Sequence, residues 1–182
     1  MTILKPCLSV VAMMAVGSLV GCSTTSTKAA DVSDSIRTSL DQAGLKDVTE
    51  TQDRDKGVVT LGGHVAGYED KAQAESIARS FAGNQVVANQ IAVIPPGAES
   101  AAKQVNADLD KGIESNLDAA LINARLRESV SYAVKNHVVT LTGDVDSQSK
   151  RARAEEVASA VLNVHQVVNE LQVKKQRATS SN

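Results

Sequence analysis

The stretch GVVTLGGHV, residues 57–65, decides the fold, because a close copy of it, HVVTLTGDV, occupies residues 137–145, 80 positions later. Both stretches are rich in β-branched residues and have a glycine near the end, which is typical of a strand that leaves through a bend. Such a repeat is improbable by chance. The sequence therefore predicts two copies of one structural unit.

The flanking segments repeat as well, which extends each copy in both directions. Downstream the spacing is again 80, and upstream it is 81, so one residue is inserted ahead of the repeated strand. The matched residues are Ala74, Ile77, Ala78 and Phe81 with Ala154, Val157, Ala158 and Val161; Val87, Asn89, Ile91 and Val93 with Val167, Asn169, Leu171 and Val173; and Val32, Ile36, Leu40 and Leu45 with Ile113, Leu117, Leu121 and Leu126.

Each copy has the same predicted element order. Apolar residues every four positions predict a first helix, strands are expected at 48–52 and 130–134 ahead of the repeated strand, and a second helix with small apolar residues follows. Ser147 is placed to cap the second helix of copy two, and an alternating strand closes each copy. The predicted fold class is α+β, as two tandem αββαβ domains, each a small sheet packed with two helices.

This order, the strand motif and the closing V-V-x-N-x-[IL]-x-V resemble the BON (bacterial OsmY and nodulation) domain, and two copies resemble dual-BON-domain envelope lipoproteins. Two turn positions differ from the pattern: His137 stands where glycine is usual, and Asn163 where copy one has Gly83. Both residues tolerate a positive φ. The expected division is a signal peptide 1–21, a flexible tether 22–30, BON domain 1 over 31–94, a linker 95–111, BON domain 2 over 112–173 and a polar basic tail 174–182.

The N-terminus predicts export and lipid attachment. Lys5 precedes a short apolar run that ends in LVGC, residues 19–22, and this tetrapeptide resembles a bacterial lipobox. The resemblance implies cleavage before Cys22, acylation of that residue and, because residue 23 is not Asp, delivery to an outer membrane facing the periplasm. Cys22 is then the only cysteine left, so no intramolecular disulfide is expected; the other reading is a chance cysteine in an ordinary signal.

Composition excludes several functions. The formal net charge is −2 and the chain has no Trp, which argues against nucleic-acid binding. Two Cys and three His, well separated, predict no four-ligand metal site, and no cofactor motif is present. We expect structural or solvated roles for His64, His137 and His165, and a backbone-bonding role for Asn89 and Asn169. No catalytic residue is predicted, and a hydrolase would need a triad that is not seen.

Basic residues gather in the second copy and the tail, which suggests a partner. They are Lys150, Arg151, Arg153, Lys174, Lys175 and Arg177. Cations near an anionic leaflet gain about 1 kcal/mol each, and BON resemblance implies phospholipid contact, envelope integrity and osmotic stress tolerance. We therefore expect a non-catalytic, lipid-anchored protein that binds anionic phospholipids. The alternatives are a protein–protein adaptor in envelope assembly and, for the cluster itself, a merely solvated basic face.

Overall fold

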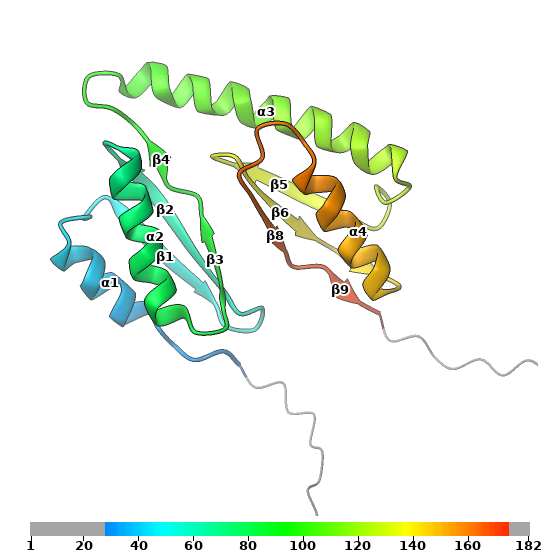
Figure 1. Cartoon of the computed structure of the whole chain (residues 1–182), viewed down its shortest axis with the longest axis horizontal. Coiled ribbons are helices and arrows are strands. Elements are labelled where there is room, and N and C mark those ends of the chain that lie inside the picture. The colour runs from blue at the N-terminus through cyan, green and yellow to red at the C-terminus, as the bar shows by residue number, and fades with distance from the viewer. Residues whose placement is uncertain (1–27, 175–182) are drawn as a thin grey trace, which may run out of the picture.

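The computed structural model describes residues 28–174, which form two α+β domains lying side by side (Figure 1). Within this range, no helix is both long and apolar enough to cross a membrane. In each domain the two helices cover one face of the sheet, as expected for αββαβ units. The predicted Cys22, Lys175 and Arg177 lie outside the described residues.

The first domain has a sheet in the order β1-β2-β3, with β4 also pairing with β2. Strand β1 is antiparallel to β2, whereas β3 and β4 are parallel to it. Its elements are α1 (Ser33–Gln42), β1 (Val48–Asp53), β2 (Val58–Val65), α2 (Tyr68–Ala82), β3 (Val86–Asn89) and β4 (Ala92–Val93).

The second domain repeats this arrangement, with β5 antiparallel and β8 parallel to the central β6. Its first helix starts at Glu99, within the segment interpreted as a linker, so most of residues 95–111 are helical. The elements are α3 (Glu99–Asn123), β5 (Ser131–Lys135), β6 (Val138–Thr142), β7 (Asp144–Val145), α4 (Gln148–Ser159), β8 (Gln166–Asn169) and β9 (Gln172–Val173).

The strand predicted over 138–145 is interrupted at Gly143, where the first copy has one continuous strand. Gly143 has a φ of 121°, and a Cβ there would lie 2.6 Å from the Ser129 carbonyl oxygen. Only glycine accommodates that backbone and that close approach. The interruption produces β7, which pairs in parallel with β9.

The turn substitutions noted in the sequence keep the geometry of the glycines they replace. His137 has a φ of 69° where Gly57 has 67°, and Asn163 has 67° where Gly83 has 59°. The predicted capping of α4 is also confirmed, because the Ser147 hydroxyl accepts a hydrogen bond from the Lys150 backbone N–H at 3.3 Å.

Each domain has its own hydrophobic core, built from the apolar positions that repeat in the sequence. Ile36 and Leu61 in the first core, and Leu117 and Leu141 in the second, are fully buried. The alanines of α2 and α4 that pack on the sheets are also fully buried; small side chains let these helices lie close to the strands. Phe81, one of the matched apolar positions, is 40% exposed instead.

A third apolar cluster joins the domains, on the sheet faces opposite the helices. It consists of Val58 and Ala88 from the first domain and Val138 and Val168 from the second. This cluster, and the polar contacts around it, form what we call the domain seam. The expectation of two separate cores is confirmed, but the cores are connected through this seam.

Polar contacts across the seam are reciprocal. The Lys56 ammonium, in the turn before β2, bonds the Glu170 carboxylate between β8 and β9 at 2.6 Å. The Asn136 amide, in the matching turn before β6, donates to the Gln90 carbonyl between β3 and β4 at 2.7 Å. Each domain's turn therefore contacts the strand junction of the other.

Gln166 adds a contact that has no counterpart in the first domain. Its side-chain oxygen accepts the Asn89 backbone N–H at 3.0 Å, and its side-chain nitrogen donates to the Val87 carbonyl at 2.7 Å. One glutamine thus satisfies two backbone groups on the open edge of β3, where an unpaired strand would otherwise be exposed.

Candidate functional site

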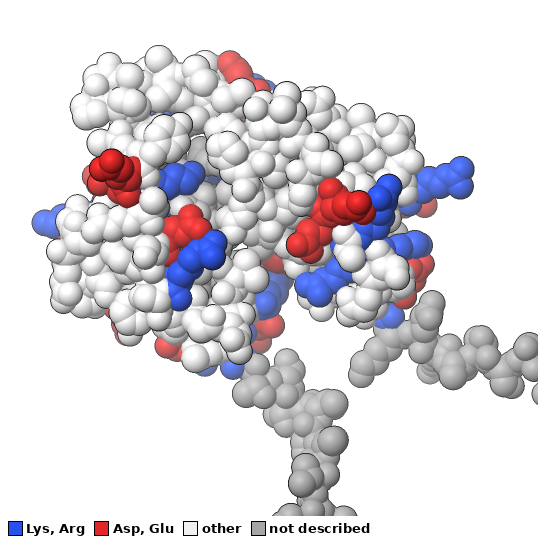
Figure 2. Space-filling view, viewed as in Figure 1, with Lys and Arg blue, Asp and Glu red and all other residues white. Residues whose placement is uncertain are grey.

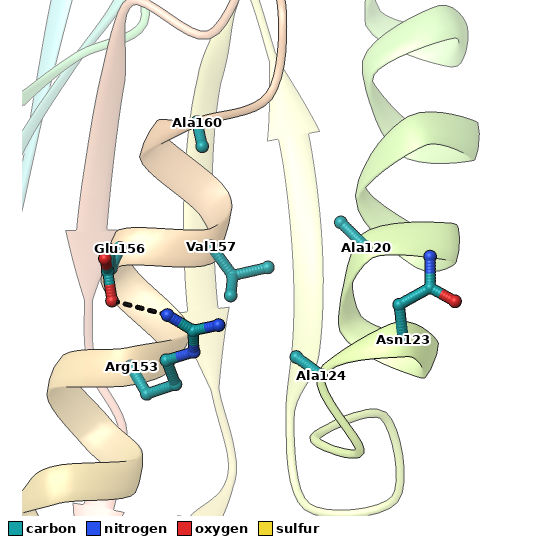
Figure 3. A pocket seen from close by; sticks show the side chains of 7 residues that line it. All are labelled: Ala120, Asn123, Ala124, Arg153, Glu156, Val157 and Ala160. Atoms are coloured by element: carbon teal, nitrogen blue, oxygen red, sulfur yellow. Dashed lines mark hydrogen bonds and ion pairs between the residues drawn. The ribbon is translucent and has the colours of Figure 1, made fainter.

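The three predicted cations in the first turns of α4 have different partners. The Lys150 ammonium bonds Asp146 at 2.6 Å, which lowers the pKa of that carboxyl. Arg153 bonds Glu156 at 2.8 Å (Figure 3). Arg151 is half-buried and donates to the Asn169 carbonyl of its own domain at 3.0 Å. The exposed side chains of Lys150 and Arg153 can therefore exchange their carboxylate partners for another anion, whereas Arg151 stabilises the fold of its domain.

Lys174 lies at the same end of the domain as Lys150. Its backbone N–H donates to the Val145 carbonyl at 2.8 Å, and Val145 directly precedes Asp146, the ion-pair partner of Lys150. The side chain of Lys174 is exposed. The structure therefore brings together two of the cations predicted from distant parts of the sequence.

A groove between α3 and α4 was not predicted. Its volume is about 390 Å³. Small apolar side chains line its interior and polar side chains lie at its edge (Figure 3). The residues that line it are Ala120, Asn123, Ala124, Arg153, Glu156, Val157 and Ala160. The signal in the sequence was the four-residue spacing of Ala120 and Ala124, which marks a narrow helix face.

Arg125 is a second feature missed from the sequence. It follows Ala124 directly, has a φ of 57° and is exposed, so a cation stands at the end of α3 beside the groove. Figure 2 shows Lys and Arg side chains gathered over this end of the second domain, with acidic side chains among them. We call Arg125, Lys150, Arg153 and Lys174 the basic rim.

The histidines do not form a site with a nucleophile or a metal. His64 is exposed on β2, and the described residues include no cluster of three or more His, Cys, Asp or Glu placed to hold a metal ion. His137 and His165, however, stack with ring centroids 4.8 Å apart. No sequence pattern predicts this pair, because the two residues lie in separate loops 28 positions apart.

The conserved position of Asn89 and Asn169 within the repeat is structural, as expected. Asn89 is buried and donates to the Lys71 carbonyl and, at 2.9 Å, to the Glu75 carboxylate, while its oxygen accepts the Ile91 backbone N–H. Asn169 makes the equivalent bonds in the second domain. These amides hold the second helix against the break between the last two strands.

Comparison with known proteins agrees with this architecture. The BON domain profile matches residues 29–95 and 109–175. The chain is 30% identical over 137 residues to the osmotically-inducible protein Y of Escherichia coli (strain K12), across 74% of this chain and 67% of that protein.

Two solved structures of CdsD, a structural protein of the type III secretion system of Chlamydia trachomatis, are also similar. One, of the C-terminal domain, has a TM-score of 0.33 and 10% identity, and covers 78% of this chain and 67% of that chain. The other has a TM-score of 0.35 and 13% identity, over 76% and 90%. These superpositions are loose, whereas both copies match the domain profile. The chain belongs to the BON domain family and carries two BON domains.

Proposed function

We propose that this chain is a non-catalytic, lipid-anchored protein of the cell envelope whose second BON domain contacts anionic phospholipid headgroups and supports envelope integrity under osmotic stress. The basic rim carries the proposal, because it places exposed cations at one end of one domain. The similarity to an osmotically inducible protein supports the role in stress. The proposal includes no cofactor.

The energetics favour a weak contact. Lys150 and Arg153 already have exposed acidic partners, and such surface pairs contribute about 0–1 kcal/mol. A basic residue beside an anionic leaflet gains about 1 kcal/mol, so the net free energy of exchanging a carboxylate partner for a headgroup is small. Arg125 and Lys174 form no ion pair within residues 28–174, and they supply the gain.

A weak headgroup contact becomes effective when an anchor holds the protein at the membrane. The lipobox-like LVGC at residues 19–22 supplies that anchor in our proposal, at Cys22. Anchoring raises the effective concentration of the basic rim at the leaflet. Cys22→Ala should abolish incorporation of an alkyne-bearing fatty acid in growing cells; label retained by this variant would refute the anchor.

Liposome flotation tests the headgroup contact. A chain starting at residue 22 with Cys22→Ser should float with vesicles of phosphatidylglycerol or cardiolipin and hardly with neutral ones, and less as salt rises, because the screening length at physiological salt is about 8 Å. Reversing Arg125 and Lys174, the two cations that supply the gain, to Glu should abolish flotation. Reversing Lys28 and Lys46, exposed in the first domain, is the matched control.

The adaptor alternative makes the opposite prediction. If the basic rim docks an acidic protein, vesicle composition should not matter, and the Arg125 and Lys174 reversals should leave flotation unchanged. Equal binding to neutral and anionic vesicles would therefore reject the lipid contact and favour the adaptor.

A further inference from the structure

Two small hollows adjoin between the domains, of about 40 and about 170 Å³. Lys71 and His165 line both of them, and His137, stacked on His165, lines the smaller one. Lys71 belongs to α2 of the first domain, whereas both histidines belong to turns of the second. The cluster therefore exists only when the two domains are packed together.

The cluster is short of negative charge, because its one carboxylate, that of Glu75 in the larger hollow, is paired with Arg79. Lys71 is half-buried and takes part in none of the ion pairs formed within residues 28–174. Glu75, one helical turn further along α2, bonds Arg79 and Asn89. Burial lowers the pKa of Lys71, and the attraction of Glu75 opposes that shift only in part. Burial, together with His137 and Lys71, lowers the pKa of His165.

The other charged and polar groups around the hollows leave this deficit in place. The Asp110 carboxylate accepts the backbone N–H groups of Asn136 and His137, at 2.7 and 2.9 Å. Tyr68 and Asn106 line the smaller hollow, and their hydroxyl and amide groups are able to donate hydrogen bonds. The walls thus offer an anion an ammonium, two imidazoles and neutral donors and, in the larger hollow, the Glu75–Arg79 ion pair.

We propose that these hollows bind a phosphate-sized oxyanion, held across the domain seam by Lys71, His137 and His165. Charge-assisted hydrogen bonds from these groups are the stronger kind, and a bound anion offsets the buried charge of the lysine. The ligand is inorganic phosphate or the phosphate of a headgroup, which share this chemistry. The site goes beyond the membrane contact proposed above and uses none of the basic rim.

The duplication supplies a natural control. The first domain has Gly57 and Gln85 at the positions of His137 and His165, so the histidine pair is present in one domain alone. Replacing both histidines by those residues removes the imidazoles, and the glycine suits the φ of 69° at position 137. The variant His137→Gly/His165→Gln should therefore fold and lose the site.

The test is a titration of the full chain, held in an uncharged detergent, with inorganic phosphate. The imidazole nitrogen signals of His137 and His165 should shift together and saturate as phosphate is added. Lys71→Gln should weaken binding at least about tenfold, whereas Lys46→Gln, at an exposed lysine, should not.

The conservative variant and vesicles complete the test. Lys71→Arg should retain binding, since it keeps the charge. If vesicles of phosphatidylglycerol shift the same imidazole signals and free phosphate displaces them, the ligand is a headgroup. If only free phosphate shifts the signals, the ligand is a soluble anion. Either result supports the site. The proposal is overturned if neither shifts the imidazoles in a saturable way, or if Lys46→Gln weakens binding as much as Lys71→Gln.

Discussion

Gln166→Ala should loosen the domain seam without unfolding either domain. The substitution removes two hydrogen bonds to β3, those to the Asn89 N–H and the Val87 carbonyl. At about 0.5–1.5 kcal/mol net for each bond, the loss is about 1–3 kcal/mol, which corresponds to an about 5- to 150-fold increase in the population with an open seam.

Amide hydrogen exchange measures this opening directly. The Asn89 N–H bonds Gln166, whereas the next amide, that of Gln90, bonds the Leu61 carbonyl within its own domain. Exchange at Asn89 should accelerate by at least the factor above, because the substitution also removes the acceptor of that N–H, while exchange at Gln90 stays slow. Gln73→Ala, at an exposed glutamine of α2, should change neither rate.

Two results would refute this reasoning. Unchanged exchange at Asn89 in a folded Gln166→Ala protein would show that the glutamine contributes nothing to the seam. Equal acceleration at Asn89 and Gln90 would show that the first domain opens as a whole, and that the two domains do not separate at the seam before they unfold.

Three further predictions concern stability. Burial raises the pKa of Glu50, so the stability that this group contributes is present below its unfolded pKa and is lost as pH rises through its folded pKa. Glu50→Gln should therefore raise the Tm near pH 7 and not near pH 4. An equal change in Tm at both pH values would contradict this. Leu141→Ala, at a fully buried residue, should cost about 2–5 kcal/mol in denaturant unfolding, with the first-domain amides largely spared in hydrogen exchange. Gly112→Ala, in open space on α3, should stabilise by about 1 kcal/mol, whereas Gly143→Ala should destabilise strongly; the opposite order of Tm would reject the assignment of these two glycines.

The interior of each domain could be predicted from the sequence because local periodicity and duplication report on it. Residues such as Ile36 and Leu117 recur in register, and the same side chains are buried in both copies. The interruption at Gly143 was missed because Gly63, its counterpart, lies within a continuous strand. The close approach of a carbonyl does not distinguish the two copies, because Gly63 faces the Asp47 carbonyl as Gly143 faces that of Ser129, and we find no structural explanation for the interruption.

The seam and the sites beside it could not be predicted, since no pattern within one copy specifies how the copies meet. Lys56 and Glu170 are separated by 114 positions, and His137 and Lys71 belong to different copies. Within the predicted basic cluster, Lys150 and Arg153 are exposed, but no sequence pattern indicates that Arg151 bonds a backbone carbonyl.

The reciprocal contacts across the seam have a consequence for assembly. The repeat matches Lys56 with Asn136 and Gln90 with Glu170, and each domain bonds the other through the same two positions. This is the pattern of an isologous homodimer interface, here within a single chain. Such an interface is closed: the pairing surface of each half is consumed by the other. Within residues 28–174, a second molecule would have to exchange a whole domain to occupy this interface, whereas the outer strands β1 and β5 lie outside it.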